Sequence, residues 1–210
     1  MAIESDYIPS TYTADESTLT KSANQFSVKA LGVGTAQLAN ASVTQAKLSN
    51  INHLQLVSSQ TLGANATTVD FSSLDFNTDG EYFFEAYIIN TAANSVRLYV
   101  NNDTTDANYS TENFTAVSTT LAGSTSAAPI AATTQGGATS KWWLRGRAFL
   151  VDGYFSFESE SNRGHNSNGY EKHTGHKSSA SVANITQLTF SHASANGFGT
   201  GSIFKIYKIV

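Results

Sequence analysis

Three histidines in the segment Ser161–Ser179 are the residues of this chain best suited to hold a metal ion. His173 and His176 lie three positions apart, and His165 precedes them in the same glycine-rich, polar segment. Imidazoles from three copies of the chain could meet on a threefold axis and bind a transition metal there. Spacing within one chain is weak support for such a site, and an exposed loop is the favoured interpretation. We therefore expect no metal and no other cofactor.

Asparagine and aspartate oxygens gather in a second place, at Asn101, Asn102, Asp103 and Asp106. Such oxygens suit calcium, but the acidic spacing and terminal glutamate of an EF-hand are missing. A turn in which these side chains bond to their own backbone is the favoured interpretation.

Two tryptophans and two arginines form a third group, at Trp142, Trp143, Arg145 and Arg147. Aromatic rings offer a large contact area, and arginine stacks on them, so the group could bind a sugar or a protein partner. On a strand, neighbouring residues point to opposite faces, so at least one tryptophan belongs to a core. Trp143, Arg145 and Arg147 remain the candidate ligand-binding residues.

Support for catalysis is weak. The chain has neither the Gly-x-Ser-x-Gly nor the His-Glu-x-x-His motif of common hydrolases. Glu158 and Glu160 share a strand face and could act as an acid/base pair, although solvated strand residues explain them equally well. We expect a protein without enzymatic activity.

The residues that must position these groups read as short strands separated by turn clusters. Ser and Thr make up 52 of the 210 residues, which favours strands and turns over helices. Asp152-Gly153 suits a two-residue hairpin turn. The pattern predicts an all-β fold, an antiparallel β-sandwich of jelly-roll type over 53–210. The expected strands are Leu54–Ser59, Thr67–Phe71, Tyr82–Asn90, Val96–Val100, Phe114–Leu121, Trp142–Val151, Tyr154–Glu158, Ile185–Phe190 and Ile203–Ile209.

The segment Glu81–Ile89 carries apolar residues on both strand faces. Tyr82, Phe84, Ala86 and Ile88 share one face, and Phe83 and Tyr87 lie on the other. A strand with one wet face should not carry aromatic residues on both sides. We expect Phe83 and Tyr87 to meet a neighbouring subunit.

Composition excludes several classes of function. A net charge of −4 offers no basic patch for nucleic acid, and the chain has no cysteine for disulfides or thiolate metal sites. The sequence has no secretion signal and no apolar stretch long enough for a membrane span. We expect synthesis in a cytoplasm and no membrane insertion.

Residues 1–52 differ in character from the rest and contain two ten-residue repeats, LGVGTAQLAN and ASVTQAKLSN. Such a polar segment cannot bury enough surface to fold alone, so we expect an extended arm that orders against a partner. The candidate anchoring residues are Tyr7, Ile8, Phe26 and Val28, and the repeat positions expected to pack around a threefold axis are Val33, Leu38, Val43 and Leu48.

Several segments resemble bacteriophage virion proteins of the tail-fibre and head-decoration type. TAQLA (35–39) and SVTQAKL (42–48) resemble the T-x-K-L repeats near the N-termini of these proteins. LYVNNDTT (98–105) with Asn108-Tyr109, and the ending GSIFKIY (201–207), resemble segments of phage jelly-roll domains.

The resemblance implies a structural protein of a tailed-phage virion, made in the bacterial host. It implies a homotrimer with a jelly-roll head and an arm docked on capsid or tail proteins, as a short fibre or a capsid decoration. The alternative function is host attachment, in which loops such as 101–113 or 161–179 recognise a surface glycan.

Overall fold

The computed structural model describes residues 19–22, 25–28, 54–117, 120–134, 140–163, 169–178 and 181–209. The chain divides into two compact units, Met1–Ile51 and Asn52–Val210, whereas the sequence placed the boundary between 52 and 53. In the first unit, β1 (Leu19–Ser22) pairs antiparallel with β2 (Gln25–Val28). No helix within the described residues is long and apolar enough to cross a membrane.

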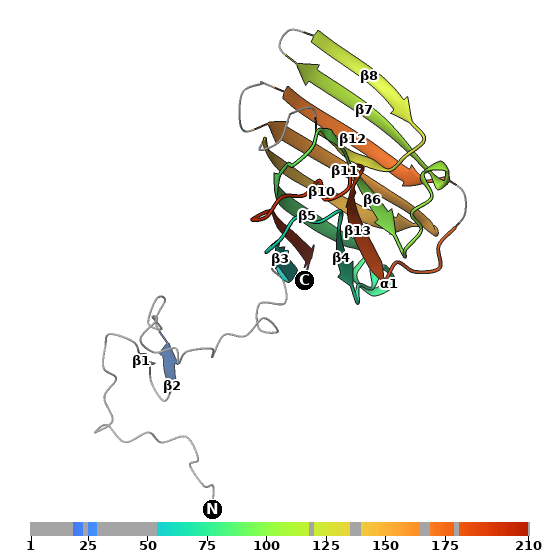
Figure 1. The fold of residues 1–210 in the computed structure, drawn as a ribbon. Helices are drawn as coiled ribbons and strands as arrows, with labels where there is room; N and C mark the ends of the chain where they lie inside the picture. The colour runs from blue at the N-terminus through green and yellow to red at the C-terminus, as the bar shows by residue number, and fades with distance from the viewer. Residues whose placement is uncertain are drawn as a thin grey trace, which may run out of the picture. The chain divides into compact units, whose positions relative to one another are not determined.

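The second unit is built almost wholly of strands (Figure 1). Its helical turns are α1 (Phe76–Asp79) and the 3-10 turn η3 (Asp106–Asn108). The strands are β3 (Leu54–Thr61), β4 (Thr68–Ser72), β5 (Glu81–Ile89), β6 (Asn94–Val100), β7 (Tyr109–Val117), β8 (Thr120–Ser126), β9 (Ile130–Thr134), β10 (Lys141–Val151), β11 (Tyr154–Arg163), β12 (Gly169–Lys177), β13 (Gln187–His192) and β14 (Ile203–Ile209).

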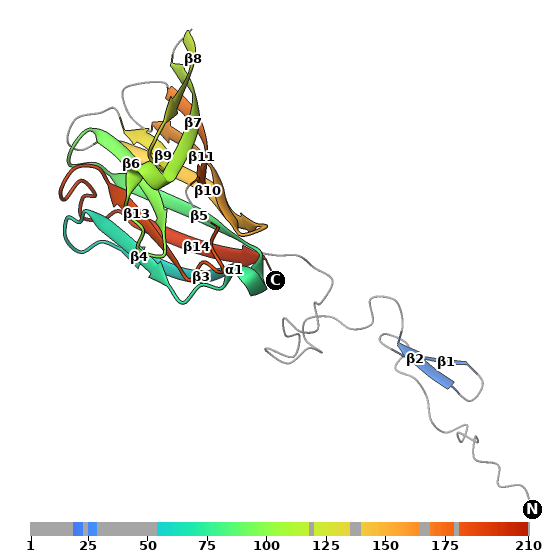
Figure 2. The ribbon, with the colours of Figure 1, turned by 90° about the vertical axis from the view of Figure 1, so that its right-hand side faces the viewer.

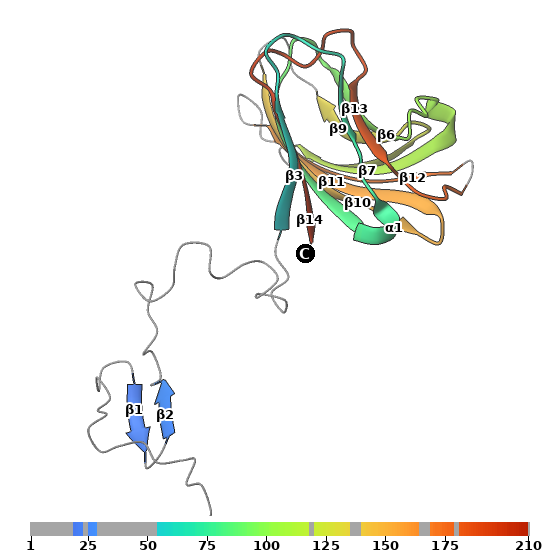
Figure 3. The same ribbon diagram turned by 90° about the horizontal axis from the view of Figure 1, so that it is seen from below.

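The strands form two antiparallel sheets, which lie as two layers (Figures 2 and 3). The larger has the order β3-β14-β5-β10-β11-β12-β7-β8, and the smaller has the order β4-β13-β6-β9. Four pairings are nested along the chain: β3 with β14, β4 with β13, β5 with β10 and β6 with β9. Successive pairs alternate between the sheets, as in a long hairpin rolled into a barrel. The predicted jelly-roll sandwich is confirmed.

Two further hairpin excursions widen the larger sheet. β7 and β8 lie between β6 and β9 in the chain, and β11 and β12 lie between β10 and β13. All four add to the sheet beyond β10, so that β8 forms its outer edge (Figure 1). β9 packs across the inner side of this extension, where the Ser159 hydroxyl donates to the Ala131 carbonyl at 2.6 Å.

The core lies between the two sheets and is rich in aromatic rings. Phe190 of the small sheet contacts Phe84 and Phe204 of the large sheet, with ring centroids 5.4 and 5.5 Å apart. Phe198, from the segment before β14, packs 5.0 Å from Phe204. The Phe84–Phe190 and Phe198–Phe204 pairs are edge-to-face and the Phe190–Phe204 pair is tilted, and these contacts add to the burial that drives the two sheets together.

The strand predictions succeed where residues alternate strongly and fail where small residues dominate. In β5 the even-numbered residues are buried and the odd-numbered ones half-buried, as expected. The expected strand Phe114–Leu121 instead covers the end of β7 and the start of β8, which pair antiparallel with each other. β8 and β9 were not predicted because Ser, Thr, Ala and Gly in these segments resemble loop composition, and β12 was not predicted because glycine, charged residues and histidines fill it.

Candidate functional site

The outer face of the larger sheet, turned away from the smaller sheet, carries an ordered row of charges. Strand pairing sets five residues directly opposite one another across β12, β11, β10, β5 and β14. Their charges alternate in sign from strand to strand, an arrangement that favours cross-strand pairing. In order they are Lys172, Glu160, Arg145, Glu85 and Lys205.

The inner members of this charged row are engaged. The Arg145 guanidinium donates to Glu160 Oε2 from Nη2 at 2.9 Å and from Nε at 3.2 Å. Hydrogen bonds from Arg145 and then Tyr170 lower the pKa of Glu160 below its ordinary value. The Tyr207 hydroxyl donates to Glu85 at 3.2 Å, whereas no ion pair joins Lys205 to a carboxylate within the described part of the chain.

A second row crosses the same strands one step along. It places Glu158 opposite Arg147, Arg147 opposite Phe83, and Phe83 opposite Tyr207. Arg147 lies 3.4 Å from Glu158 and 3.9 Å from Glu81. The Arg147, Glu158 and Glu81 side chains are 46%, 35% and 29% exposed, so each ion pair contributes at most about 1 kcal/mol to stability.

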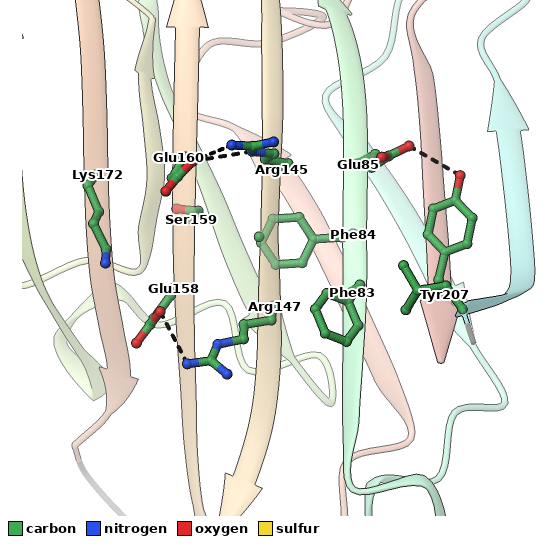
Figure 4. A pocket seen from close by; sticks show the side chains of 12 residues that line it. Phe83, Phe84, Glu85, Arg145, Arg147, Glu158, Ser159, Glu160, Lys172 and Tyr207 are labelled. Carbon is green, nitrogen blue, oxygen red and sulfur yellow. Dashed lines mark hydrogen bonds and ion pairs between the residues drawn. The ribbon is translucent and has the colours of Figure 1, made fainter. Parts of the chain in front are cut away.

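A hollow of about 310 Å³ lies over the strands that carry these two rows. Figure 4 shows Glu158, Glu160, Arg145 and Arg147 along its borders, with Phe84 behind β10 between the two arginines. The Phe84 ring packs against Gly146, where a Cβ atom would lie 2.4 Å from Phe84 Cζ. Glycine is therefore required at the point where the ring crosses this strand.

A smaller hollow of about 60 Å³ adjoins the charged row on its other side and is lined by Glu85, Tyr87, Trp143, Ile203 and Lys205. Trp143 is 47% exposed. Its ring centroid lies 6.4 Å from that of Tyr87, with an angle of 56° between the ring planes. The hollow combines an accessible aromatic pair with the ammonium group of Lys205, which forms no ion pair within the described ranges of the chain.

The tryptophan prediction is confirmed: Trp142 is 2% exposed in the core, and Trp143 faces solvent on the opposite side. Trp143, Arg145 and Arg147 share the outer face, but the carboxylates of Glu158 and Glu160 already engage both arginines. The same pairings leave neither glutamate as an unengaged acid or base.

Sequence reasoning missed Lys205 and Tyr207 as members of this face. They lie about sixty positions from Trp143 along the chain and reach it only because β14 pairs with β5. Their alternation with buried Phe204 and Ile206 was the available signal, since it places them on one side of the last strand.

The prediction that Ser161–Ser179 is an exposed loop is wrong, because most of this segment forms the end of β11 and the whole of β12. His173 is fully buried on the inner face, where its Nε2 lies 3.2 Å from Glu171 Oε2. His176 is exposed, since three positions along a strand reverse the face. The buried His173 cannot reach a metal on a symmetry axis. His165 lies outside the described residues, within which no cluster of three or more potential metal ligands occurs.

The segment 101–108 is a turn followed by η3, in which the Thr105 N–H donates to Asp103 Oδ1 at 3.2 Å, whereas Asn101 bonds to Asn184 and Thr186 in another segment. Asn101 and Asn102 adopt positive φ angles of 49° and 61°. Asp103 accepts from Lys177 Nζ at 2.6 Å and from the Asn108 amide at 2.9 Å. Burial acts to raise the pKa of Asp103, but the hydrogen bonds from Lys177 and Asn108 outweigh it and the pKa is lowered.

The proposed glycan-binding segments are therefore not simple loops. Residues 101–113 comprise this turn, η3 and the start of β7, and residues 161–179 are mostly strand. Among the expected subunit contacts, Phe83 lines the larger hollow and Tyr87 lines the smaller one. Phe26 and Val28 belong to β2, whereas six expected arm residues lie outside the described residues: Tyr7, Ile8, Val33, Leu38, Val43 and Leu48.

Comparison with known proteins yields no match to a family model and no match to a curated protein.

Proposed function

We propose that this chain is a structural component of a tailed-phage virion, a homotrimer that serves as a short fibre or a capsid decoration. Residues 1–52 attach it to capsid or tail proteins, and the jelly-roll unit projects. Support comes from the resemblance of residues 31–50, 98–109 and 201–207 to phage proteins, and from the division of the chain near residue 52.

The observation that carries the assembly is an apolar patch on the outer face, formed by Leu54, Leu56, Phe83, Tyr207 and Ile209. Register brings Leu54 opposite Ile209, and Leu56 opposite Tyr207. Leu54 is 52%, Leu56 51% and Ile209 37% exposed in the single chain. Contiguous exposed apolar residues of this kind mark interaction surfaces.

The location of the patch fits an oligomer whose arms emerge together. Leu54 and Leu56 lie in β3, the edge strand through which the chain enters the unit from the arm. A neighbouring copy would cover both the apolar side chains and an open sheet edge, which otherwise invites uncontrolled pairing. Three arms presented side by side then combine weak individual contacts through effective concentration.

The subunit contact is tested by Leu56→Asp in the full chain, with native mass measured by light scattering. A buried, unpaired carboxylate opposes association, so we expect the variant to be monomeric. Phe114→Asp is the matched control, since Phe114 is 45% exposed on the same face but lies six strands from β3. An unchanged oligomer for Leu56→Asp would overturn the proposed contact.

Virion attachment is tested by comparing purified phage particles made with the full chain and with a chain lacking residues 1–51. We expect only the full chain to co-purify with particles, as quantified by mass spectrometry. Equal incorporation of the two forms would show that the arm is not the anchor.

Recognition of a host-surface glycan is the second candidate function. The exposed ring of Trp143 beside the ammonium group of Lys205 favours it.

A further inference from the structure

We propose that the hollow beside Trp143 is a subsite for a saccharide that carries a carboxylate, with its sugar ring over Trp143 and its carboxylate on Lys205. This inference rests on the second candidate function, glycan recognition, and does not depend on virion attachment. It names the ligand class and moves the site from the loops to the face of the sheet.

The aromatic half of the subsite is held in place before any ligand arrives. Trp142 anchors the strand in the core, and its indole N–H donates to the Ser140 hydroxyl at 3.1 Å. Trp143 is therefore fixed on the outer face, where Tyr87 supports its ring from the neighbouring strand. A rigid, half-exposed tryptophan offers contact area at little cost in conformational entropy.

The charge around the hollow specifies an acidic ligand. Two charged residues line the hollow, Glu85 and Lys205. The Glu85 carboxylate accepts a hydrogen bond from the Tyr207 hydroxyl and lies opposite Arg145 in the charged row. Lys205 ends that row, and within the described residues no carboxylate forms an ion pair with it. The next residue across the sheet is Ser59 of β3, opposite Lys205, so a ligand carboxylate above this position would supply an anionic partner for the ammonium group.

The size of the hollow agrees with this division of roles. Its volume of about 60 Å³ is about a fifth of that of the larger hollow, so we place only the carboxylate substituent of the saccharide in it. The sugar ring would then lie over Trp143. The rest of the oligosaccharide would extend past Glu85 toward the larger hollow, which Glu85 also lines.

A second protein copy suits this part of the face poorly. Covering it with protein would desolvate Lys205 without a partner and remove water from the exposed Arg145–Glu160 pair, whose arginine side chain is 67% exposed. A hydrated saccharide leaves these groups in contact with water while it uses the aromatic ring.

The test uses the full chain and two oligosaccharides of equal length. The acidic probe is the hyaluronan hexasaccharide, which alternates glucuronic acid with N-acetylglucosamine, and the neutral probe is chitohexaose. Binding is measured by calorimetry and by tryptophan fluorescence, to which the buried Trp142 contributes a background that the ligand does not contact. We expect the acidic probe to bind with a Kd on the order of 0.1–1 mM and the neutral probe to bind at least about tenfold more weakly.

Variants assign the two halves of the subsite. Trp143→Ala should abolish binding of both probes, and Lys205→Gln should weaken the acidic probe by about tenfold while leaving the neutral probe unchanged. Tyr154→Ala is the matched control, since it removes a 54% exposed ring from the far end of the β10–β11 hairpin. This variant should bind as the unaltered chain does.

Each contrary outcome overturns part or all of the assignment. Equal binding of both probes would refute the carboxylate specificity. Absence of binding, or binding unaffected by Trp143→Ala, would refute the site. Protection of Trp143 from iodide quenching in the ligand-free protein would make a second copy the occupant. The native mass, measured on the same samples, tests the trimer independently of the binding data. A result against the homotrimer can therefore be told apart from a result against the saccharide site.

Discussion

Gly146→Ala should destabilise the jelly-roll unit strongly, because its Cβ has no space. The added atom would lie 2.2 Å from the Glu158 carbonyl oxygen and 2.4 Å from Phe84 Cζ. Ordinary contacts of this kind are about 3.5–4.0 Å, so both neighbours would have to move by more than about 1 Å. The carbonyl belongs to the backbone of β11, and Phe84 is only 1% exposed and packs against Phe190.

Neither the β11 backbone nor the buried Phe84 ring can move without disturbing its own packing. The loss in the free energy of unfolding should therefore lie at the upper end of the range for overpacking, about 3 kcal/mol. For a protein of this size that corresponds to a decrease in Tm of roughly 6–12 °C. Thermal unfolding followed by circular dichroism measures it. Gly123→Ala is the control, since the same change in β8 meets only the Asn113 carbonyl oxygen at 3.6 Å. The control should stay within about 0.5 kcal/mol of the unaltered chain.

Phe84→Leu tests the mechanism, because a smaller side chain makes room beside β10. The double variant Gly146→Ala/Phe84→Leu should be less destabilised than the sum of the single changes by about 1 kcal/mol. Additive effects would show that the ring does not lie against Gly146. A Gly146→Ala variant as stable as the Gly123→Ala control would refute the described pairing of β5, β10 and β11.

Three further predictions concern a charge pair and the dependence of stability on pH. Asp103→Asn removes the carboxylate 2.6 Å from Lys177, whose side chain is only 10% exposed, and should cost about 3 kcal/mol in urea unfolding. Glu160→Gln breaks an exposed pair and should cost less than about 1 kcal/mol; equal losses would contradict the difference in burial. Because the pKa of Asp103 is lowered in the folded state, its stabilisation is present above about pH 4 and is lost as the pH falls through the folded pKa. The unaltered chain should therefore lose stability there more steeply than Asp103→Asn. Burial lowers the pKa of His192, whose Nδ1 accepts a hydrogen bond from the Ser194 N–H in the neutral ring, so the folded state binds fewer protons than the unfolded one. Stability should fall as the pH drops below about 6.5, and His192→Gln should remove that slope in a pH series of unfolding curves. An unchanged slope would place the responsible group elsewhere.

The sequence predicted those elements whose local residue pattern is enough to indicate strand or turn geometry. The apolar residues of Glu81–Ile89 occupy both faces of β5. The even-numbered residues are buried in the core, and the odd-numbered residues on the outer face are half-buried. Asp152 and Gly153 adopt φ angles of 51° and 79°, as a two-residue hairpin turn with left-handed central residues requires. The opposite orientations of Trp142 and Trp143 follow from strand geometry alone.

What the sequence did not predict depends on partners that are distant in the chain. The composition of β12, rich in glycine and polar residues, is typical of a loop. Gly175 is nevertheless required in this strand, because a Cβ atom there would lie 2.2 Å from Cε1 of the Phe157 ring. The burial of His173 likewise follows from its position between β11 and β7, not from its neighbours in sequence. The subsite of Trp143 and Lys205 required the pairing of β14 with β5, which no local pattern specifies.

The native mass of the full chain in solution, measured by light scattering, tests the central proposal most directly. We expect a particle of three times the chain mass of 22.4 kDa, which Leu56→Asp converts to single chains. A particle of 22.4 kDa for the unaltered chain at micromolar concentration would contradict the homotrimer.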